Sequence, residues 1–176
     1  LFKACSKMML SIQYLPQPVI ACVDGIAAAA GCQLVASCDL AFASKNSYFQ
    51  TPGVNIGLFC STPMVALSRA VNKKASMEML LTGDLIQPNK AKEIGLINDI
   101  FTSQELNTKV LNIAKKIATK SKHTLKVGKE AFYKQKEMKI EDAYKYASSV
   151  MVDNILNDDA EEGIEAFIEK RKPIWK

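Results

Sequence analysis

Charged and apolar positions are distributed very unevenly along the 176 residues of the chain. Only five of the 41 formal charges (23 basic and 18 acidic) fall in residues 1–68, at Lys3, Lys7, Asp24, Asp39 and Lys45. Interior and interface segments exclude charges, whereas a helix with one solvated face carries them at regular intervals. The pattern therefore predicts that residues 1–68 lie almost entirely in the interior or in an interface. Residues 69–176 are predicted to form helices with one solvent-exposed face.

Short apolar runs in the first part predict an α/β core. The run Pro18–Val23 is rich in β-branched residues and ends at the turn dipeptide Asp24-Gly25, which indicates a buried strand. Small, helix-favouring residues then predict a buried helix over Ala27–Cys38. Further short strands are predicted at Leu40–Ala43 and Ser47–Phe49. Strand, helix and strand in quick succession are typical of an α/β fold.

Helical spacing dominates the second part, and the first residues of the chain show it too. Thr102 and Glu105 form a capping box before a helix with one apolar stripe, made by Leu106, Val110, Ile113, Ala114 and Ile117. The other predicted helices are Thr62–Val71, Lys73–Leu81, Pro88–Ile94, Thr124–Gln135, Glu141–Leu156 and Asp159–Lys172.

Composition and charge are those of an ordinary globular chain, with 48% hydrophobic and 23% charged residues. The net charge of +5 comes almost entirely from lysine. It would suit a polyanionic ligand or merely keep the protein dissolved, and both explanations stay open. Basic and aromatic residues do not alternate, so we expect no nucleic-acid partner. The longest uncharged run, residues 46–68, is too polar and too often broken by Pro and Gly for a membrane span.

The cysteines indicate free thiols in a reducing compartment. There are five, an odd number, without a Cys-x-x-Cys pair, at Cys5, Cys22, Cys32, Cys38 and Cys60. We expect no metal site.

The segment Asp24–Leu34 is the strongest candidate for chemistry, because a strand ends, small residues follow and a helix begins. The free N–H groups at such a helix start, with the positive end of the helix dipole, favour an anion or an oxyanion. Small side chains let a carbonyl group of a ligand approach the backbone. Alternatively, alanine and glycine serve only tight helix–strand packing.

The spacing Pro18-Val-Ile-Ala-x-Val-x-Gly-x-Ala-x-x-x-Gly-Cys-x-Leu-x-x-x-Cys-Asp39 resembles the signature of the enoyl-CoA hydratase/isomerase (crotonase) family. The similarity continues through Leu40–Ser44, Phe49-x-x-Pro52, Gly57-Leu58, Arg69–Val71, Met79–Gly83, Ala91–Ile97 and Ala166–Lys172. It is strongest toward the enoyl-CoA hydratase domain-containing branch. The resemblance implies that an N-terminal part of the family's domain lies outside this chain.

This resemblance implies a ClpP/crotonase-like α/β spiral core followed by a C-terminal helical region. Residues 1–100 would be the C-terminal portion of the core, and residues 101–176 a helical trimerisation region. We expect a homotrimer or hexamer whose ligand is an acyl-CoA thioester. Coenzyme A would enter as part of the substrate, with no other cofactor. The expected location is the cytoplasm of a bacterium or, alternatively, the mitochondrial matrix.

The family's site residues map onto this chain with two departures. The oxyanion N–H matches Ala30, and the two catalytic glutamates match Gln33 and Gly53. An amide forms hydrogen bonds but cannot take and release a proton, and glycine offers no group at all. Other expected substrate contacts are Ala28, Ala29, Gly31 and Pro52. On the last helix, Phe167 and Lys170 match the residues that close over the adenine nucleotide, often from a neighbouring subunit.

We therefore predict an acyl-CoA-binding family member with atypical or weak lyase or isomerase chemistry. Two alternatives stay open: a non-catalytic acyl-CoA sensor or assembly subunit, and a hydrolase or decarboxylase that uses the oxyanion hole. Cys60 or Ser61 as a nucleophile needs a base, and His123, the only histidine, is expected on the surface. Asp39 is expected to bond backbone N–H groups. A Clp-type serine peptidase is disfavoured, because no serine stands at the helix start.

Overall fold

The computed structural model describes residues 1–176, which form two compact units. Unit 1 comprises Leu1–Gln13 and Val19–Ala114, and unit 2 comprises Tyr14–Pro18 and Lys115–Lys176. The units divide inside helix α6 (Ser103–Ala118). The expected division at residue 100 into a core portion and a trimerisation region stays a prediction.

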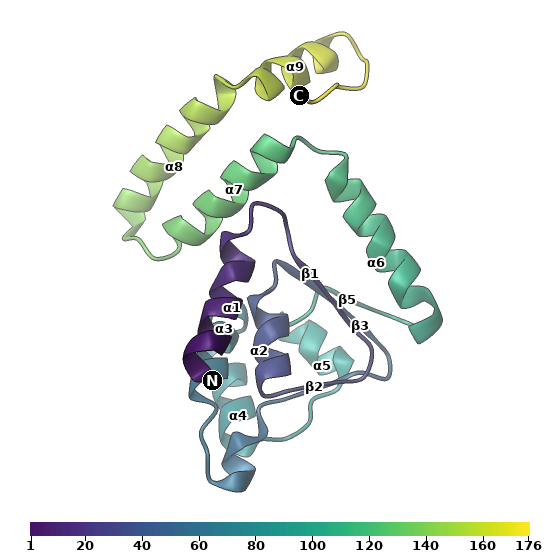
Figure 1. The fold of residues 1–176 in the computed structure, drawn as a ribbon, viewed down its shortest axis with the longest axis vertical. Coiled ribbons are helices and arrows are strands. Elements are labelled where there is room, and N and C mark those ends of the chain that lie inside the picture. Colours follow the sequence, from purple (N-terminus) through teal and green to yellow (C-terminus); the bar gives the residue numbers. More distant parts are fainter. The chain divides into compact units, whose positions relative to one another are not determined.

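Unit 1 is built on two small parallel sheets (Figure 1). The first contains β1 (Ile20–Val23), β3 (Leu40–Ser44) and β5 (Asp99–Phe101), in that order. The second pairs β2 (Ile26–Ala28) with β4 (Tyr48–Gln50), so that Ala28 lies opposite Gln50. Parallel pairing of strands separated by helices confirms the predicted α/β class.

Two of the predicted elements of unit 1 need correction. The predicted helix over Ala27–Cys38 is a strand, β2, followed by a shorter helix, α2 (Ala30–Ser37), because backbone pairing with β4 overrides the helical preference of alanine. The first predicted strand, β1, is only half-buried, since it is the edge strand of its sheet. The strand β5 and the 3₁₀ helix η1 (Pro52–Ile56) were missed.

Four further helices belong mainly to unit 1 and agree closely with the sequence pattern. They are α1 (Phe2–Tyr14), α3 (Ser61–Ala70), α4 (Lys73–Thr82) and α5 (Pro88–Glu93). The Asn72 side chain caps α4 by accepting the Ala75 N–H at 3.0 Å, and Gly83 ends it with a φ of 64°. The core beneath these helices is closely packed, with Phe49, Leu67, Met79 and Ala91 almost fully buried.

The capping box before α6 is confirmed. Thr102 Oγ1 donates to Glu105 Oε2 at 2.6 Å, and the Glu105 N–H donates to Thr102 Oγ1 at 3.3 Å. Leu106 and Val110 from the predicted apolar stripe pack on Phe42 of β3 in a second core cluster. The start of α6 therefore covers the first sheet.

Unit 2 contains the helices α7 (Lys122–Gln135), α8 (Ile140–Ile155) and α9 (Asp158–Ile168). Ser121 accepts the Thr124 N–H at 3.0 Å to cap α7, and its hydroxyl donates to the buried carboxylate of Asp159 at 2.5 Å. Helix α9 ends at Ile168, before the predicted Lys172. Its end has a Schellman pattern, in which the Arg171 N–H reaches the Ala166 carbonyl at 3.0 Å and Lys170 has a positive φ of 56°.

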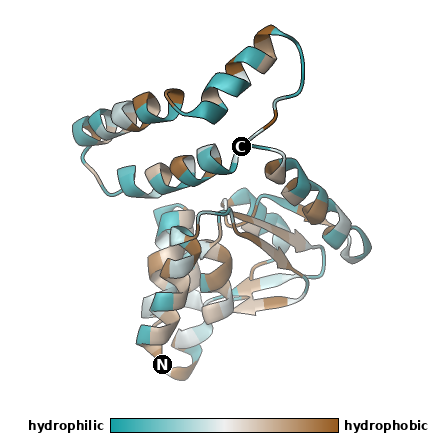
Figure 2. Ribbon diagram, turned by 45° about the horizontal axis from the view of Figure 1, so that its top comes forward, coloured by the Kyte–Doolittle hydropathy of each residue, from teal (hydrophilic) through white to brown (hydrophobic).

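Many large apolar side chains are exposed in both units. Figure 2 shows how apolar residues, in brown, alternate with polar ones along the helices. In residues 1–68 the exposed apolar residues include Phe2, Leu10, Tyr14, Ile26, Ile56, Leu58 and Val65. The expectation that this part is nearly all interior is therefore wrong for these positions, and the interface alternative stays a prediction. No helix has the length and apolar character needed to cross a bilayer.

An ion pair folds the C-terminal tail back onto α9. Arg171 Nη1 and Nη2 donate to the two Glu162 oxygens at 2.5 and 2.9 Å, and the Ile174 N–H donates to Glu162 Oε1 at 2.7 Å. Trp175 Nε1 donates to the Thr119 carbonyl at 2.7 Å. The Arg171 hydrogen bonds lower the pKa of Glu162 from 4.5 to about 2.

This depressed pKa predicts how the tail contributes to stability as a function of pH. The contribution of Glu162 is present above its ordinary pKa of 4.5 and is lost as the pH falls through about 2. Thermal unfolding of wild type and Glu162→Gln should therefore differ at pH 6 and converge near pH 2. The control, Glu165→Gln, lies on the same helix without an Arg171 contact and should show no such trend. A gap for Glu162→Gln that is unchanged at pH 2 would contradict the assignment.

Candidate functional site

The candidate site is the tight turn between β2 and α2. Strand β2 ends at Ala28, Ala29 has φ 49° and ψ −111°, and α2 begins at Ala30. Ala30 is exposed, and Gly31 adds no side chain at the next position. The backbone at this end of α2 is therefore open to a ligand.

The hydrogen bonds of Ala29 fix the direction of the next N–H group. The Ala29 N–H donates to the Gln50 carbonyl at 2.9 Å, and the Ala29 carbonyl accepts the Gln33 N–H at 3.0 Å. The N–H and C=O of one trans peptide point in opposite directions. Because the Ala29 carbonyl points along α2, the Ala30 N–H points out of the N-terminal end of the helix, where no group of the chain accepts it.

The Ala29 backbone is strained. Ala29 and Lys170 are the two non-glycine residues with positive φ, and such a conformation typically costs about 1–3 kcal/mol. The two hydrogen bonds of Ala29 oppose this cost, at about 0.5–1.5 kcal/mol each. The free-energy cost of the strained conformation is therefore similar in size to the stabilisation that the two hydrogen bonds provide.

Gln33 lies one turn further along α2, on the same side as Ala30, since residues three apart share a helix face. It is 4% exposed, and its Oε1 is approached by the Cys5 thiol at 3.8 Å. Its amide nitrogen has no acceptor within the chain. This nitrogen is not among the buried polar atoms that lack a hydrogen-bond partner, so it is accessible enough to donate to a ligand or to solvent. Burial raises the pKa of the neighbouring Cys32 thiol to about 12.

Neighbouring atoms leave no room for a side chain at position 53. A Cβ there would lie 2.5 Å from the Leu58 carbonyl oxygen and 2.9 Å from Cys60 Sγ, closer than side chains approach in proteins. The Gly53 N–H donates to Cys60 Sγ at 3.3 Å, and the Leu58 N–H donates to the Gly53 carbonyl at 2.9 Å. No side chain, and therefore no carboxylate, fits at position 53 unless the segment Leu58–Cys60 moves.

The strand before Gly53 is anchored on α4. Thr51 Oγ1 donates to the Met79 carbonyl at 2.8 Å, and Gln50 Nε2 donates to the Gly83 carbonyl at 2.7 Å. Pro52, an expected substrate contact, occupies the first turn of η1 and is half-buried. The segment that carries positions 50 to 53 is thus attached to α4 at two successive residues.

The alternative nucleophiles have no base. The Cys60 Sγ accepts the Gly53 N–H, and the Ser61 hydroxyl donates to the Phe59 carbonyl, so neither group is paired with a histidine or carboxylate. His123 is exposed, as expected. Asp39 has the structural role that was predicted, since its Oδ2 accepts the Val19 N–H at 2.6 Å. No three potential metal ligands gather anywhere in the chain.

Phe167 and Lys170 lie at the end of α9 in unit 2. Phe167 is 84% exposed, and the Lys170 ammonium makes no ion pair within the chain. Lys170 occupies the left-handed position of the helix end, where glycine is the usual residue. The structure therefore presents an aromatic ring and a free cation close together in the sequence.

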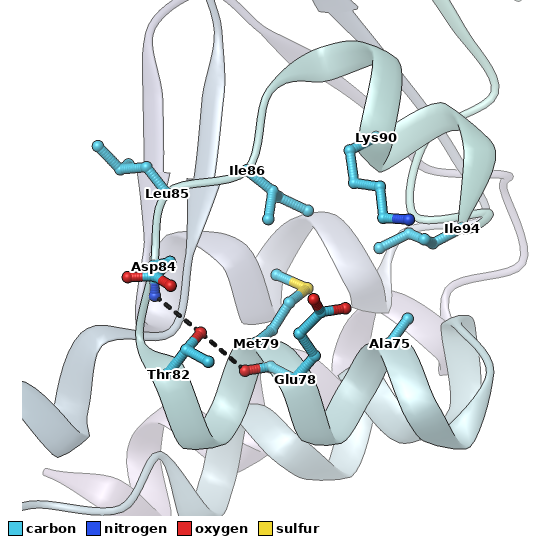
Figure 3. A pocket seen from close by; sticks show the side chains of 9 residues that line it. All are labelled: Ala75, Glu78, Met79, Thr82, Asp84, Leu85, Ile86, Lys90 and Ile94. Atoms are coloured by element: carbon cyan, nitrogen blue, oxygen red, sulfur yellow. Dashed lines mark hydrogen bonds between the residues drawn. The ribbon is translucent and has the colours of Figure 1, made fainter.

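Sequence reasoning missed a cavity of about 210 Å³ at the end of α4 (Figure 3). Its lining residues are Ala75, Glu78, Met79, Thr82, Asp84, Leu85, Ile86, Lys90 and Ile94. They come from α4, α5 and the segment between them, which is held by an antiparallel bridge between Ile86 and Phe49. No sequence motif marks this cavity, whose walls meet through core packing and the Ile86–Phe49 bridge.

Comparison with known proteins identifies the family. Residues 2–176 match the enoyl-CoA hydratase/isomerase family. The chain is 52% identical to the mitochondrial enoyl-CoA hydratase domain-containing protein 3 of Mus musculus, over 99% of this chain and 58% of that protein. The Homo sapiens protein of that name is also 52% identical, with 99% and 57% covered. The chain thus spans less than three fifths of the length of these relatives.

Solved structures agree with this assignment. A Mycobacterium smegmatis enoyl-CoA hydratase superposes with a TM-score of 0.97 at 48% identity, covering 99% of this chain and 68% of that one. The human domain-containing protein 3 superposes with a TM-score of 0.96 at 52% identity, covering 99% and 69%. The fold is the crotonase fold, as the sequence resemblance implied. The chain belongs to the enoyl-CoA hydratase/isomerase family.

The packing around Gly53 predicts that even a methyl group destabilises the protein. Gly53→Ala should lower the free energy of unfolding by about 1–3 kcal/mol, the usual cost of overpacking. Gly128→Ala is the matched control, because a Cβ at Gly128 in α7 meets no atom within 4 Å. It should raise stability by about 0.5–1 kcal/mol. Urea denaturation measures the free energy of unfolding of both variants. A Gly53→Ala variant as stable as wild type would show that position 53 has room for a side chain.

Proposed function

We propose that this protein binds acyl-CoA thioesters at the β2–α2 turn and is a poor hydratase and isomerase. The Ala30 N–H faces the thioester carbonyl, and Gln33 offers an amide where the family has a glutamate. Family membership and the open backbone of Ala30 and Gly31 support the ligand class. The observation that carries the proposal is the closure of position 53 by Leu58 and Cys60.

Hydration of a 2-enoyl thioester needs one group to activate water and a proton delivered to C2. Isomerisation needs a base that moves a proton between C2 and C4. Gln33 can do neither, and Gly53 has no room for a carboxylate. Since each general acid or base contributes about 10²–10⁴-fold, losing two lowers the rate by about 10⁴-fold or more.

Binding without efficient turnover is favoured over hydrolysis at the oxyanion hole. The Ala30 N–H can still polarise a carbonyl, and one such donor is typically worth about 2.7–4 kcal/mol in a transition state. A hydrolase also needs a nucleophile with a base, and neither Cys60 nor Ser61 has one. An acyl-CoA sensor or assembly subunit therefore agrees better with the arrangement of side chains.

The nucleotide end of coenzyme A is assigned to Phe167 and Lys170 in this proposal. The exposed ring can stack on adenine, and the unpaired ammonium can approach a phosphate. The positive φ of Lys170 supports a role for its side chain, because glycine would be the easier residue there.

Assembly and location are also part of the proposal. Helix α8 exposes Tyr144, Met151, Val152 and Ile155, which suits burial in a homotrimer or hexamer. The relatives from mouse and human are mitochondrial by name, so the mitochondrial matrix is the proposed compartment.

The central test measures binding and hydration with the full-length protein. Calorimetry should detect butyryl-CoA binding, whereas crotonyl-CoA hydration should run about 10⁴-fold or more below an ordinary hydratase. Gln33→Glu should add little, since the second carboxylate is still missing, and Gln33→Met serves as the matched uncharged control. An ordinary hydratase rate would overturn the catalytic part of the proposal, and absence of butyryl-CoA binding would overturn the ligand.

A second test addresses the adenine contact. Phe167→Ala should weaken butyryl-CoA binding by about 5- to 150-fold, because stacking of a base on an aromatic ring is worth about 1–3 kcal/mol. Butyryl-pantetheine lacks adenine, so its affinity should not change. Ile168→Ala is the control, because Ile168 is a neighbouring residue that is also exposed. Equal losses with both ligands would show that Phe167 acts through folding or assembly instead.

A further inference from the structure

The end of α4 carries negative charge that no ion pair within the chain neutralises. Asp84 follows the C-cap residue Gly83, at the negative end of the helix dipole, and Glu78 lies one turn earlier, inside the helix. The last turn of α4 contains no basic residue. Both acidic side chains are exposed, and neither carboxylate forms an ion pair or a hydrogen bond within the chain. A cation bound at this end of α4 would therefore relieve electrostatic repulsion.

Glu78 and Asp84 both line the cavity of about 210 Å³, which lies entirely within unit 1 (Figure 3). Figure 3 shows the Glu78 carboxylate directed from α4 toward the segment that carries Ile86. Backbone hydrogen bonds of 2.9 and 3.0 Å between Ile86 and Phe49 attach that segment to the core. Most of the remaining lining is apolar, namely Ala75, Met79, Leu85, Ile86 and Ile94. The cavity therefore combines two carboxylates with an apolar surface.

Lys90 is the only basic residue that lines the cavity, and its ammonium group is already paired. Its Nζ donates to Glu93 Oε1 at 3.1 Å, and Glu93 itself does not line the cavity. This pair leaves the two unpaired carboxylates as the net charge of the lining. A short apolar chain with one positive end matches such a surface in both charge and polarity. A metal ion matches it less well, because no three potential metal ligands gather in the chain.

We propose that this cavity is a binding site for a primary alkylammonium ion. The ammonium group faces the carboxylates of Glu78 and Asp84, and the carbon chain lies against Met79, Ile86 and Ile94. A free amine and the side chain of a lysine on another protein share this chemistry. The site is separate from the β2–α2 turn, so this inference does not depend on acyl-CoA binding.

The experiment titrates n-butylammonium chloride into the full-length protein and follows the ligand by saturation-transfer NMR. The matched probes are n-butyrate and n-butanol, because they have the same chain with a negative charge or with none. We expect n-butylammonium to bind with a Kd on the order of 1 mM, and the other two probes to bind at least about 10-fold more weakly. Raising NaCl to about 0.5 M should weaken the binding of n-butylammonium, because the carboxylates are exposed to solvent.

Three substitutions identify the charges responsible. Glu78→Gln and Asp84→Asn should each weaken n-butylammonium binding by about 2- to 5-fold, as expected for the loss of an exposed ion pair. Glu93→Gln should weaken it too, although Glu93 does not line the cavity, because the Lys90 ammonium then loses its partner. Glu165→Gln in α9 is the control and should leave the affinity unchanged.

Asp84→Asn also separates binding from folding. Without the amine, this variant should have a Tm about 1–4 °C above that of wild type, because it removes a negative charge beside a helix C-terminus. A lower Tm would show that Asp84 supports the fold and would remove it from the site.

A further probe, Nα-acetyl-lysine amide, identifies the source of the ammonium group. Binding of this probe as well as n-butylammonium assigns the cavity to a lysine side chain of a partner, whereas binding of n-butylammonium alone assigns it to free amines. Equal affinities for n-butylammonium and n-butyrate would overturn the proposal, because charge would then not select the ligand. Unchanged n-butylammonium binding in both Glu78→Gln and Asp84→Asn would also overturn it, since the amine would then bind elsewhere.

Discussion

The pairing of β2 with β4 is the interaction on which the candidate site depends. It turns an alanine-rich stretch that would otherwise continue the helix into a strand, and it ends with the Ala29 N–H on the Gln50 carbonyl. That bond sets where α2 begins, and therefore which N–H groups are left without an acceptor. Strand β4 is itself fixed by the Ile86 bridge and by the Gln50 amide on Gly83. The orientation of one peptide thus depends on contacts from three separate stretches of the chain.

The two positions that are expected to match the family's glutamates, Gln33 and Gly53, differ physically. Gln33 is a change of one functional group in a buried environment that remains polar. Gly53 is a change of packing, because the carbonyl of Leu58 and the thiol of Cys60 occupy the space of a side chain. Position 33 keeps a side chain that can form hydrogen bonds, whereas position 53 has no room for any side chain. This scaffold can therefore hold a ligand that needs a polar contact at Gln33 and none at position 53.

Much of the fold could be predicted from the sequence, since local signals agree with the structure where elements are long. The capping box at Thr102 and Glu105 and the apolar stripe from Leu106 mark α6 without ambiguity. The strands β2 and β5 have three residues each, too few for a period to be read, and their pairing is non-local. At the site, motif spacing predicts a role for positions 30, 33 and 53, and this stays a prediction. The strain at Ala29 could not be predicted, because it depends on pairing with the distant Gln50. The crowding at Gly53 could not be predicted either, because it depends on how the irregular segment Leu58–Cys60 folds back.

The crowding at Gly53 also bears on how such a protein changes over generations. A glutamate introduced at position 53 meets the backbone of Leu58, so that substitution costs folding before it can provide any activity. Changes at Cys60 or in the segment after Gly57 must come first, and alone they bring no catalytic advantage. Under the proposed function, a site with two glutamates is therefore more than one substitution away from this chain. The contacts that Leu58 and Cys60 make at Gly53 thus limit which variants can be reached one substitution at a time.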